Sequence, residues 1–360
     1  MSWIKNSLPK LLLVLFWLAL LELGCWAIWN FATSERHPGA AAIRQALSGE
    51  VNRFNTILSH PYSLYWNNPD FEDAEFGPQY NALGHRSGPV PEDDDSFVVL
   101  ALGGSTTNAY PYVRDRNLIW TALLEDHLEG YLNREVTVLN AGLPYGTTAE
   151  LMVHFLMTGK YLNPDLVIYH GGGNDGMPLM FPGYRTDYSH VRAAAKARPP
   201  SKALVTLLRV SHTVRVIAAQ VMDGSVYQAQ PFGFEALDPA ETLERVRTTE
   251  PVAFESNLSI ITREAMHLGA DVLLVGFLQA KKENLATNRT DIAGLEEAIL
   301  LASDKNEAVM RKVAAENGQT FLRLDQDRFQ DDWFLDNTHL TKEGEAEKAR
   351  QIFESLKPVL

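Results

Sequence analysis

Cysteine is nearly absent from the sequence, because Cys25 is the only one among 360 residues. A single thiol cannot form a disulfide within the chain, and it cannot supply the several thiolates of a structural zinc site. The fold must therefore be stabilised by packing. The hydrophobic fraction of 46% is sufficient for a substantial core, and a chain of this length forms either one elaborated α/β domain or two domains.

Positive charge is also scarce. The sequence has 32 Lys and Arg residues against 45 Asp and Glu residues, which gives a net charge of -13 at pH 7. Proteins bind nucleic acids largely by neutralising phosphates with Lys and Arg, and an acidic chain lacks that attraction. We therefore expect no nucleic-acid partner.

Hydrophobic runs long enough to cross a bilayer are rare as well. The only one extends from Leu11 to Phe31, and ~20 helical residues at ~1.5 Å per residue span a hydrocarbon core of ~30 Å. Lys5 and Lys10 precede the run, and Trp26 and Trp29 lie where an aromatic belt would be. We predict a single-pass transmembrane anchor over residues 1–35, with a cytoplasmic N-terminus and the rest of the chain periplasmic or extracellular.

Two other interpretations of the N-terminus remain open. A cleaved signal peptide would have a shorter apolar region of ~7 to 15 residues, and no small-residue cleavage site follows this run closely. A lipoprotein signal ending at Cys25 would require an apolar residue at the position of Glu22. Glu22 also weakens the spanning interpretation slightly. The segment that follows, residues 36–95, is polar and irregular and is predicted to be a stalk or a packed preface.

From Phe97 onwards, short and nearly continuous apolar runs alternate with helical stretches. Buried parallel strands and their crossover helices produce this alternation. It predicts a three-layer α/β/α, doubly wound domain over residues 96–360, with a mainly parallel five-stranded sheet and a helical insertion at about residues 178–238. The expected strands are Phe97–Leu102, Val136–Leu139, Leu166–Tyr169, Asp271–Phe277 and Thr320–Leu324, and the expected helices include Leu118–Leu132, Ala149–Thr158, Ala193–Arg198, Ala203–Met222, Phe254–Leu268 and Leu295–Asn317. Ligands of such sheets bind in a crevice at the carboxyl ends of the strands.

A glycine turn follows the first predicted strand and leads to Ser105. Gly103 and Gly104 allow a tight bend, so that the serine comes to lie at the carboxyl end of the strand, where a nucleophile would be exposed. The lysine of a P-loop and the third glycine of a dinucleotide motif are both missing. By itself, however, this turn is equally consistent with an ordinary helix cap.

Two further loops leave the same edge of the predicted sheet. The loop from Asn140 to Thr148 is rich in glycine and can direct a backbone N–H inward, and the run Gly171 to Asp175 contains Asn174, whose side-chain amide is a donor. Serine hydrolases need fixed donors for the developing oxyanion, and loss of one donor typically lowers the rate ~10²- to 10³-fold. Asn174 fits that requirement, although an Asn-Asp pair alone could also form a turn.

Asp336 and His339 lie three residues apart, just before the final predicted helix. An aspartate bonded to one imidazole nitrogen fixes the tautomer of the ring, while the other nitrogen accepts the proton of a serine. An isolated histidine is usually structural, and we interpret the other nine in this way. Together, the strand-end serine, the two loops and the Asp336/His339 pair predict a serine hydrolase with Ser105 as its nucleophile.

With these four blocks in place, residues Phe97 to Leu360 resemble the SGNH (GDSL-type) hydrolase family. The resemblance implies a flavodoxin-like α/β/α fold, the use of Ser105 as nucleophile and oxyanion donor, and Asn174 as a further donor. It implies Asp336 as the residue that orients the base and His339 as the base itself. No metal and no cofactor are expected.

The sequence departs from the family pattern at two places. Gly104 stands where the family's namesake motif has aspartate, which is outside the proposed triad. In the second loop, Tyr145 occupies the usual position of the oxyanion glycine and Gly146 follows it. We predict the N–H of Gly146 as the donor of this loop, with Tyr145 and Gly142 as alternatives.

The predicted function is that of a serine esterase that hydrolyses acyl esters, above all acetyl esters. The predicted location outside the membrane suggests an envelope or exported polysaccharide as the ester substrate. Two alternatives remain open. An O-acyltransferase would use the same triad to pass the acyl group to a glycan hydroxyl, and an accessory protein of an envelope-assembly complex would have no activity.

Overall fold

The computed structural model describes residues 2–32, 40, 43–44, 56–91, 95–192, 202–221, 234, 237–285 and 289–360. The chain forms two compact units. Residues 1–59 and 195–228 form what we call the N-terminal unit, and residues 60–194 and 229–360 form the α/β unit. The chain therefore passes between the units three times. The predicted boundaries at residues 35 and 95 stay predictions.

The α/β unit is built on a parallel sheet of five strands, in the order β6-β5-β7-β8-β9. This confirms the predicted doubly wound fold. Because the order reverses beside β5, the crevice of the sheet lies where β5 and β7 end. Gly103 at the end of β5 pairs with Gly142 of β6 and with His170 of β7, so the three loops that follow these strands start side by side. The strands are β5 Phe97–Gly103, β6 Val136–Gly142, β7 Leu166–Gly171, β8 Asp271–Gly276 and β9 Thr320–Leu322.

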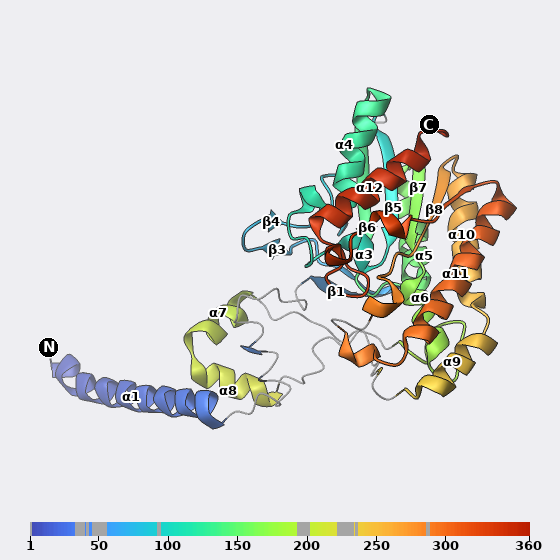
Figure 1. The fold of residues 1–360 in the computed structure, drawn as a ribbon. Coiled ribbons are helices and arrows are strands. Elements are labelled where there is room, and N and C mark those ends of the chain that lie inside the picture. Colours follow the sequence, from blue (N-terminus) through green and yellow to red (C-terminus); the bar gives the residue numbers. More distant parts are fainter. Residues whose placement is uncertain are drawn as a thin grey trace. The chain divides into compact units, whose positions relative to one another are not determined.

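Helices cover both faces of this sheet. Figure 1 shows α4 and α12 on one face, and α5, α10 and α11 on the other. The longer helices are α4 Trp120–Leu132, α5 Thr148–Met157, α9 Pro239–Thr248, α10 Val252–His267, α11 Glu296–Asn317 and α12 Lys342–Leu356, and the shorter ones are α3 Ser105–Asn108 and α6 Gly173–Met180. The 3-10 turns are η3 Arg116–Leu118, η4 Gly159–Leu162, η6 Lys282–Asn284, η7 Thr290–Ile292, η8 Gln326–Arg328 and η9 Asp331–Trp333.

Local sequence sets the ends of several of these helices. Thr147 begins α5 with a capping box, in which its side chain accepts from the helix and Glu150 bonds back to the Thr147 backbone. Thr341 caps α12 in a similar way through its side chain. Between the sheet and the pair α4 and α12, Trp120, Leu124 and Ile352 pack in a fully buried core. These contacts hold the strand ends that carry the functional loops.

Residues 60–91 are the first part of the α/β unit and pack beside the loop that follows β6. They contain β2 Leu64–Asn67, β3 Glu72–Asp73 and β4 Gly77–Pro78, while β1 Ile57–His60 precedes them. Asn67 donates to the carbonyl of Gly142 at 2.8 Å, and Tyr65 donates to the carbonyl of Pro144 at 2.8 Å. This part of the predicted preface therefore supports the loop that follows β6.

An ion pair connects β3 to the loop before α4. Arg114 donates to both carboxylate oxygens of Asp73, at 2.7 and 2.9 Å, and the hydroxyl of Tyr110 donates to the same carboxylate at 3.0 Å. The hydrogen bonds from Arg114 lower the pKa of Asp73 well below its ordinary value. The ionised form of Asp73 is thus the form that the folded state stabilises.

We expect the substitution Asp73→Asn to destabilise the protein at pH 7, and to destabilise it less at pH 3. A carboxyl whose folded-state pKa is lowered stabilises the fold above its unfolded pKa of ~3.9 and loses that contribution as the pH falls towards the folded-state value. Urea unfolding of both proteins at the two pH values measures the difference. Asp70→Asn, an exposed neighbour, is the control, and an equal loss at pH 3 and pH 7 would contradict the assigned cause.

The N-terminal unit contains α1 Ser2–Ala27, which continues into a π-helical turn, η1 Ile28–Ala32. Pro9–Phe31 is long and apolar enough to cross a membrane, by length and composition. The unit also contains α7 Lys202–Val210 and α8 His212–Val221. The stretch predicted as one helix over residues 203–222 is thus divided at Ser211, and the helix predicted over residues 193–198 lies outside the described residues.

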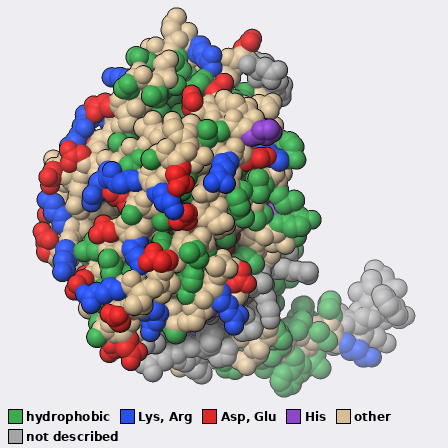
Figure 2. All heavy atoms as spheres, turned by 90° about the vertical axis from the view of Figure 1, so that its right-hand side faces the viewer, with side chains coloured by type: hydrophobic (Ala, Val, Ile, Leu, Met, Phe, Trp, Pro, Cys, Tyr) green, Lys and Arg blue, Asp and Glu red, His purple; other side chains and the backbone are tan. Residues whose placement is uncertain are grey.

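Charges of both signs are mixed on the surface of the α/β unit. On the face shown in Figure 2, Lys and Arg side chains alternate with Asp and Glu side chains. Charged side chains also form pairs along one helix, such as Arg350 with Glu347 and Glu354 at 2.6 and 2.7 Å. Such exposed pairs contribute little to stability, and the buried core described above contributes more.

Candidate active site

Ser105 is the first residue of α3 and directly follows the end of β5. The two glycines before it are required by their surroundings. A Cβ atom at Gly103 would overlap the carbonyl oxygen of His170, and one at Gly104 would lie 2.7 Å from Nδ2 of Asn174. The glycine turn therefore lets the serine come close to the loop after β7. At position 104, any side chain would have to displace the amide of Asn174.

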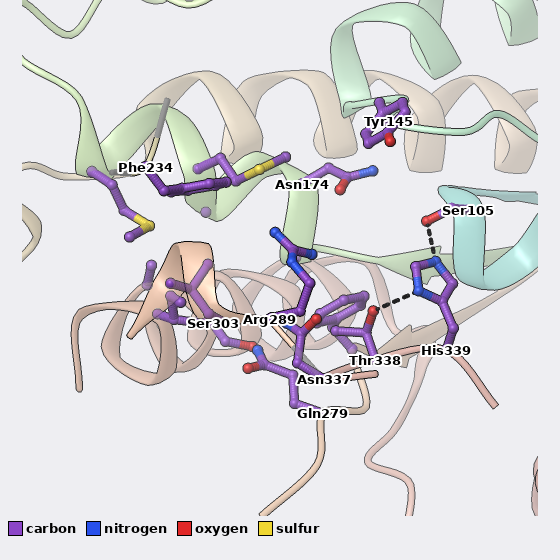
Figure 3. Close-up of a pocket in the computed structure, with 18 residues that line it drawn as sticks. Ser105, Tyr145, Asn174, Phe234, Gln279, Arg289, Ser303, Asn337, Thr338 and His339 are labelled. Carbon is purple, nitrogen blue, oxygen red and sulfur yellow. Dashed lines mark hydrogen bonds between the residues drawn. The ribbon is translucent and has the colours of Figure 1, made fainter. Parts of the chain in front are cut away.

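His339 contacts both of the residues with which it was predicted to act. Its Nε2 lies 2.8 Å from Oγ of Ser105 (Figure 3), and its Nδ1 lies 2.7 Å from Oδ2 of Asp336. The other carboxylate oxygen of Asp336 accepts the backbone N–H groups of Thr338 and His339, each at 2.8 Å. The structure thus brings Ser105 together with a pair of residues that lies more than 200 positions further along the sequence.

Local contacts determine both the charge of Asp336 and the orientation of the His339 ring. Burial alone would raise the pKa of Asp336, but the hydrogen bonds and the charge of His339 lower it below its ordinary value. Asp336 is therefore ionised and accepts the Nδ1–H of His339, which leaves Nε2 as the acceptor for the hydroxyl of Ser105. The ring of Tyr112 stacks on the imidazole, with centroids 3.7 Å apart and planes at 10°.

The side chain of Asn174, in the first turn of α6, points towards this group from the loop after β7 (Figure 3). Its Nδ2 donates to the carbonyl of Gly146 at 2.9 Å. Since a side-chain amide carries two N–H groups, this bond orients the amide and leaves a second donor. The position agrees with the role predicted for Asn174.

In the second loop, two of the three candidate N–H groups have partners within the loop. The N–H of Gly146 donates to the carbonyl of Leu143 at 2.8 Å, and the N–H of Gly142 donates to Oδ1 of Asn140 at 2.9 Å. Both groups are therefore used inside the loop, which argues against Gly146 as the donor. Tyr145, with a φ of 59°, forms the bend of this turn and lines the pocket beside Ser105. Which of the three backbone N–H groups is the donor stays a prediction.

A small pocket of about 110 Å³ opens beside Ser105 and His339. Its wall is largely apolar and is formed by Met177, Met180, Phe234, Phe277, Ile292 and Ile299. Arg289 also lines the pocket, but its guanidinium is paired with both carboxylate oxygens of Asp291 at 2.8 Å. Two buried amide oxygens, Oε1 of Gln279 and Oδ1 of Asn337, line it too, and neither has a hydrogen-bond partner among the described residues.

Two supporting residues were missed at the level of sequence. One is Tyr112, for which no spacing signal exists. The other is Lys348, which is fully buried and donates to the carbonyl of Thr106 at 2.8 Å and to Glu345 at 2.6 Å. A signal for Lys348 does exist, because it lies four residues before the buried Ile352 and so occupies the apolar stripe of α12. Its bond to Thr106 fixes the turn that carries the serine.

We expect Gly104→Ala to lower kcat about 10²-fold while leaving the fold intact. The added methyl group would displace the amide of Asn174, and the loss of one oxyanion donor has an effect of this size. Steady-state hydrolysis of a p-nitrophenyl ester measures the change. Gly130→Ala is the matched control, because no atom lies within 4 Å of a Cβ there. Wild-type kcat in the Gly104 variant would show that Asn174 is not a donor in the reaction.

No protein-family model matches the sequence, and no curated protein matches it significantly. Solved structures do match. A catalytic mutant of an acetylxylan esterase from Geobacillus stearothermophilus is 13% identical with a TM-score of 0.45, over 74% of this chain and 96% of that one. TesA is 17% identical with a TM-score of 0.40, over 73% and 99%. A GDSL-like lipase from Bacteroides thetaiotaomicron is 14% identical with a TM-score of 0.40, over 73% and 89%. The chemistry of this site follows from its own contacts.

Proposed function

We propose that this chain is a serine esterase of the SGNH type that acts through an acyl-enzyme. The observation that carries the proposal is the chain of contacts from Ser105 through His339 to Asp336, at 2.8 and 2.7 Å. A serine hydroxyl bonded to a neutral imidazole, which is itself bonded to an ionised carboxylate, is an activated nucleophile. Ser105 lies beside a pocket, so an ester can reach it.

The reaction proceeds in two halves. In the first, the proton of Ser105 passes to Nε2 of His339 while Oγ forms a bond to the ester carbonyl carbon. The amide of Asn174 and the backbone N–H groups of Ser105 and Tyr145 stabilise the resulting oxyanion. The C–O bond to the alcohol then breaks, and His339 gives its proton to the leaving oxygen. In the second half, water attacks the acyl carbon while His339 takes its proton. The bond from the acyl carbon to Oγ then breaks, His339 returns the proton to Oγ of Ser105, and the carboxylic acid leaves.

The pocket favours a short acyl group. Its volume of about 110 Å³ is well below the ~300 to 1,000 Å³ of pockets that enclose drug-sized ligands. Its apolar wall suits the methyl or ethyl end of an acyl chain. We therefore propose acetyl and propionyl esters as the best substrates.

The alcohol part of the substrate is proposed to be a sugar. The unpartnered oxygens of Gln279 and Asn337 are acceptors, and each residue is more than nine-tenths buried. A buried acceptor without a donor is costly, and a sugar hydroxyl would supply one once either side chain turned towards the pocket. Together with the apolar helix Pro9–Phe31, this supports an acylated polysaccharide at the membrane, on the side opposite Lys5 and Lys10.

The test is an ester panel combined with active-site labelling. The full-length protein in detergent is incubated with p-nitrophenyl acetate, butyrate, octanoate and palmitate, and with a fluorophosphonate probe. We expect kcat/KM to fall with chain length and the probe to label Ser105. Lack of labelling in the folded protein would overturn the proposed esterase function, whereas efficient hydrolysis of palmitate would overturn only the preference for short chains.

A further inference from the structure

A helical hairpin of the N-terminal unit remains outside the function proposed above. It consists of α7 and α8, whose amphipathic sequences lie within the segment 195–228 and which contact the end of α1. We propose that this hairpin lies in the membrane interface and inserts an apolar stripe between anionic lipids, beside the end of the transmembrane helix. This inference rests on α1 as a membrane span and does not depend on the esterase activity.

The first observation is the stripe itself. On α7, Ala203, Leu207 and Val210 follow one another at helical spacing and are exposed, and Leu207 and Val210 have exposed fractions of 51% and 71%. On α8, Ile217 and Val221 do the same, with exposed fractions of 60% and 76%. Large apolar side chains exposed in a row, on helices that are also amphipathic, are typical of surfaces that enter the lipid interface.

The opposite side of the hairpin is packed on the end of the membrane helix. Leu208 of α7 and Ala218 and Ala219 of α8 form a buried cluster with Trp29 of η1. The guanidinium of Arg215 lies over the ring of Trp29 at 6.0 Å. The apolar residues that face Trp29 are therefore already covered by protein, and the exposed stripe is a second apolar surface.

Glu22 fixes the position of the hairpin along the membrane helix. Its carboxylate accepts from the hydroxyls of Ser211 and Thr213 at 2.9 and 2.8 Å and from the backbone N–H groups of His212 and Thr213. It thus caps the N-terminus of α8, where a negative charge is favourable, and its own charge within an apolar helix is satisfied. Figure 1 shows α8 beside the end of α1.

The depth of this contact suits an interfacial helix. Glu22 precedes Trp26 by four residues, so at ~1.5 Å per residue it lies ~6 Å deeper than the aromatic belt. Interfacial helices bury their apolar faces ~5 to 10 Å below the headgroup boundary. The start of α8 is therefore held at the depth where its stripe would meet the upper part of the acyl chains, next to the headgroups.

The positive charge of the hairpin favours anionic lipids. Residues 202–221 contain three basic residues, Lys202, Arg209 and Arg215, and no Asp or Glu, in a protein whose net charge is -13. A basic, amphipathic segment on an acidic protein fits an anionic lipid surface, to which each Lys or Arg near the surface contributes attraction. A protein partner would need an apolar surface that fits this stripe at the membrane surface, where lipid is already present. We therefore infer that lipid covers the stripe.

The test places spin labels on the full-length protein in liposomes. After Cys25→Ser, single cysteines replace Leu207, Ile217, Arg209 and, as a control on the α/β unit, the exposed Met157. In vesicles of phosphatidylcholine and phosphatidylglycerol, we expect labels at 207 and 217 to be relaxed by oxygen much more than by a water-soluble nickel complex. Labels at 209 and 157 should show the reverse. If 207 and 217 behave like 157, the stripe faces water or a protein and the proposal is wrong.

Two further comparisons test the parts of the proposal. In vesicles of phosphatidylcholine alone, the labels at 207 and 217 should be less protected from the nickel complex. Unchanged protection would show that anionic lipid is not required. Glu22→Ala should increase the mobility of the label at 217 while a label at 157 is unaffected. If the label at 217 stays immobile in this variant, the contact with Glu22 does not hold α8 at this depth.

Discussion

The substitution Ser105→Ala should reduce ester hydrolysis about 10⁵- to 10⁶-fold, which is the size of effect that removing the nucleophile of a serine hydrolase produces. The reason lies in the contacts of this hydroxyl, which is 2.8 Å from Nε2 of His339. Without Oγ no acyl-enzyme can form, and the remaining donors can only assist a direct attack by water. Single-turnover and steady-state assays with p-nitrophenyl acetate measure the loss.

The control for this variant is Ser355→Ala in the last turns of α12. The hydroxyl of Ser355 donates to the carbonyl of Ile352 at 2.7 Å, far from the pocket. It should leave both the rate and the fluorophosphonate labelling unchanged. Residual activity within tenfold of the wild type in the Ser105 variant, with a normal circular dichroism spectrum, would mean that another group is the nucleophile.

The substitution Asp336→Asn should lower kcat about 10⁴-fold with little change in KM, because an asparagine offers an N–H to Nδ1 of His339 and favours the wrong tautomer. The ring would then present a proton instead of a lone pair to Ser105. The loop should keep its shape, since Oδ1 of the new side chain can still accept the two backbone N–H groups that Asp336 binds at 2.8 Å.

Comparing kcat and KM separates this effect from a structural one. Asp332→Asn, on the exposed turn η9 of the same segment, is the matched control and should retain activity. A large rise in KM in the Asp336 variant, or a similar loss of activity in the Asp332 variant, would show that the substitution disturbs the pocket instead of the base.

The sequence predicted the sheet closely, because strands that are covered on both faces form continuous apolar runs. All five strands start at the predicted residue, Phe97 being one example. Their ends were less predictable. The strand β6 continues past Leu139 to Gly142, since backbone pairing with β5 does not require an apolar side chain. Glycine and asparagine at the end of a strand are typical of loops in a sequence, although their backbone can still pair with the neighbouring strand.

The site was predictable to the extent that its residue types occur in order at strand ends. The contacts among Ser105, His339 and Asp336 agree with that prediction. The second loop was not predictable in the same way. Whether the N–H of Gly146 points into the pocket depends on the positive φ of Tyr145 and on its bond to Leu143, both of which are results of tertiary packing. A sequence pattern contains the residues of a turn but not its direction.

The chain crosses between the two units three times, and this affects how proteolysis could release the α/β unit from a membrane. A protease that cuts once between residues 33 and 55 would separate α1 from the α/β unit covalently. The hairpin of α7 and α8, however, would stay joined to that unit and bound to Glu22 and Trp29 through the contacts described above. A single cut should therefore fail to release the enzyme from membranes, and only a detergent or two further cuts, one on each side of the hairpin, would set it free.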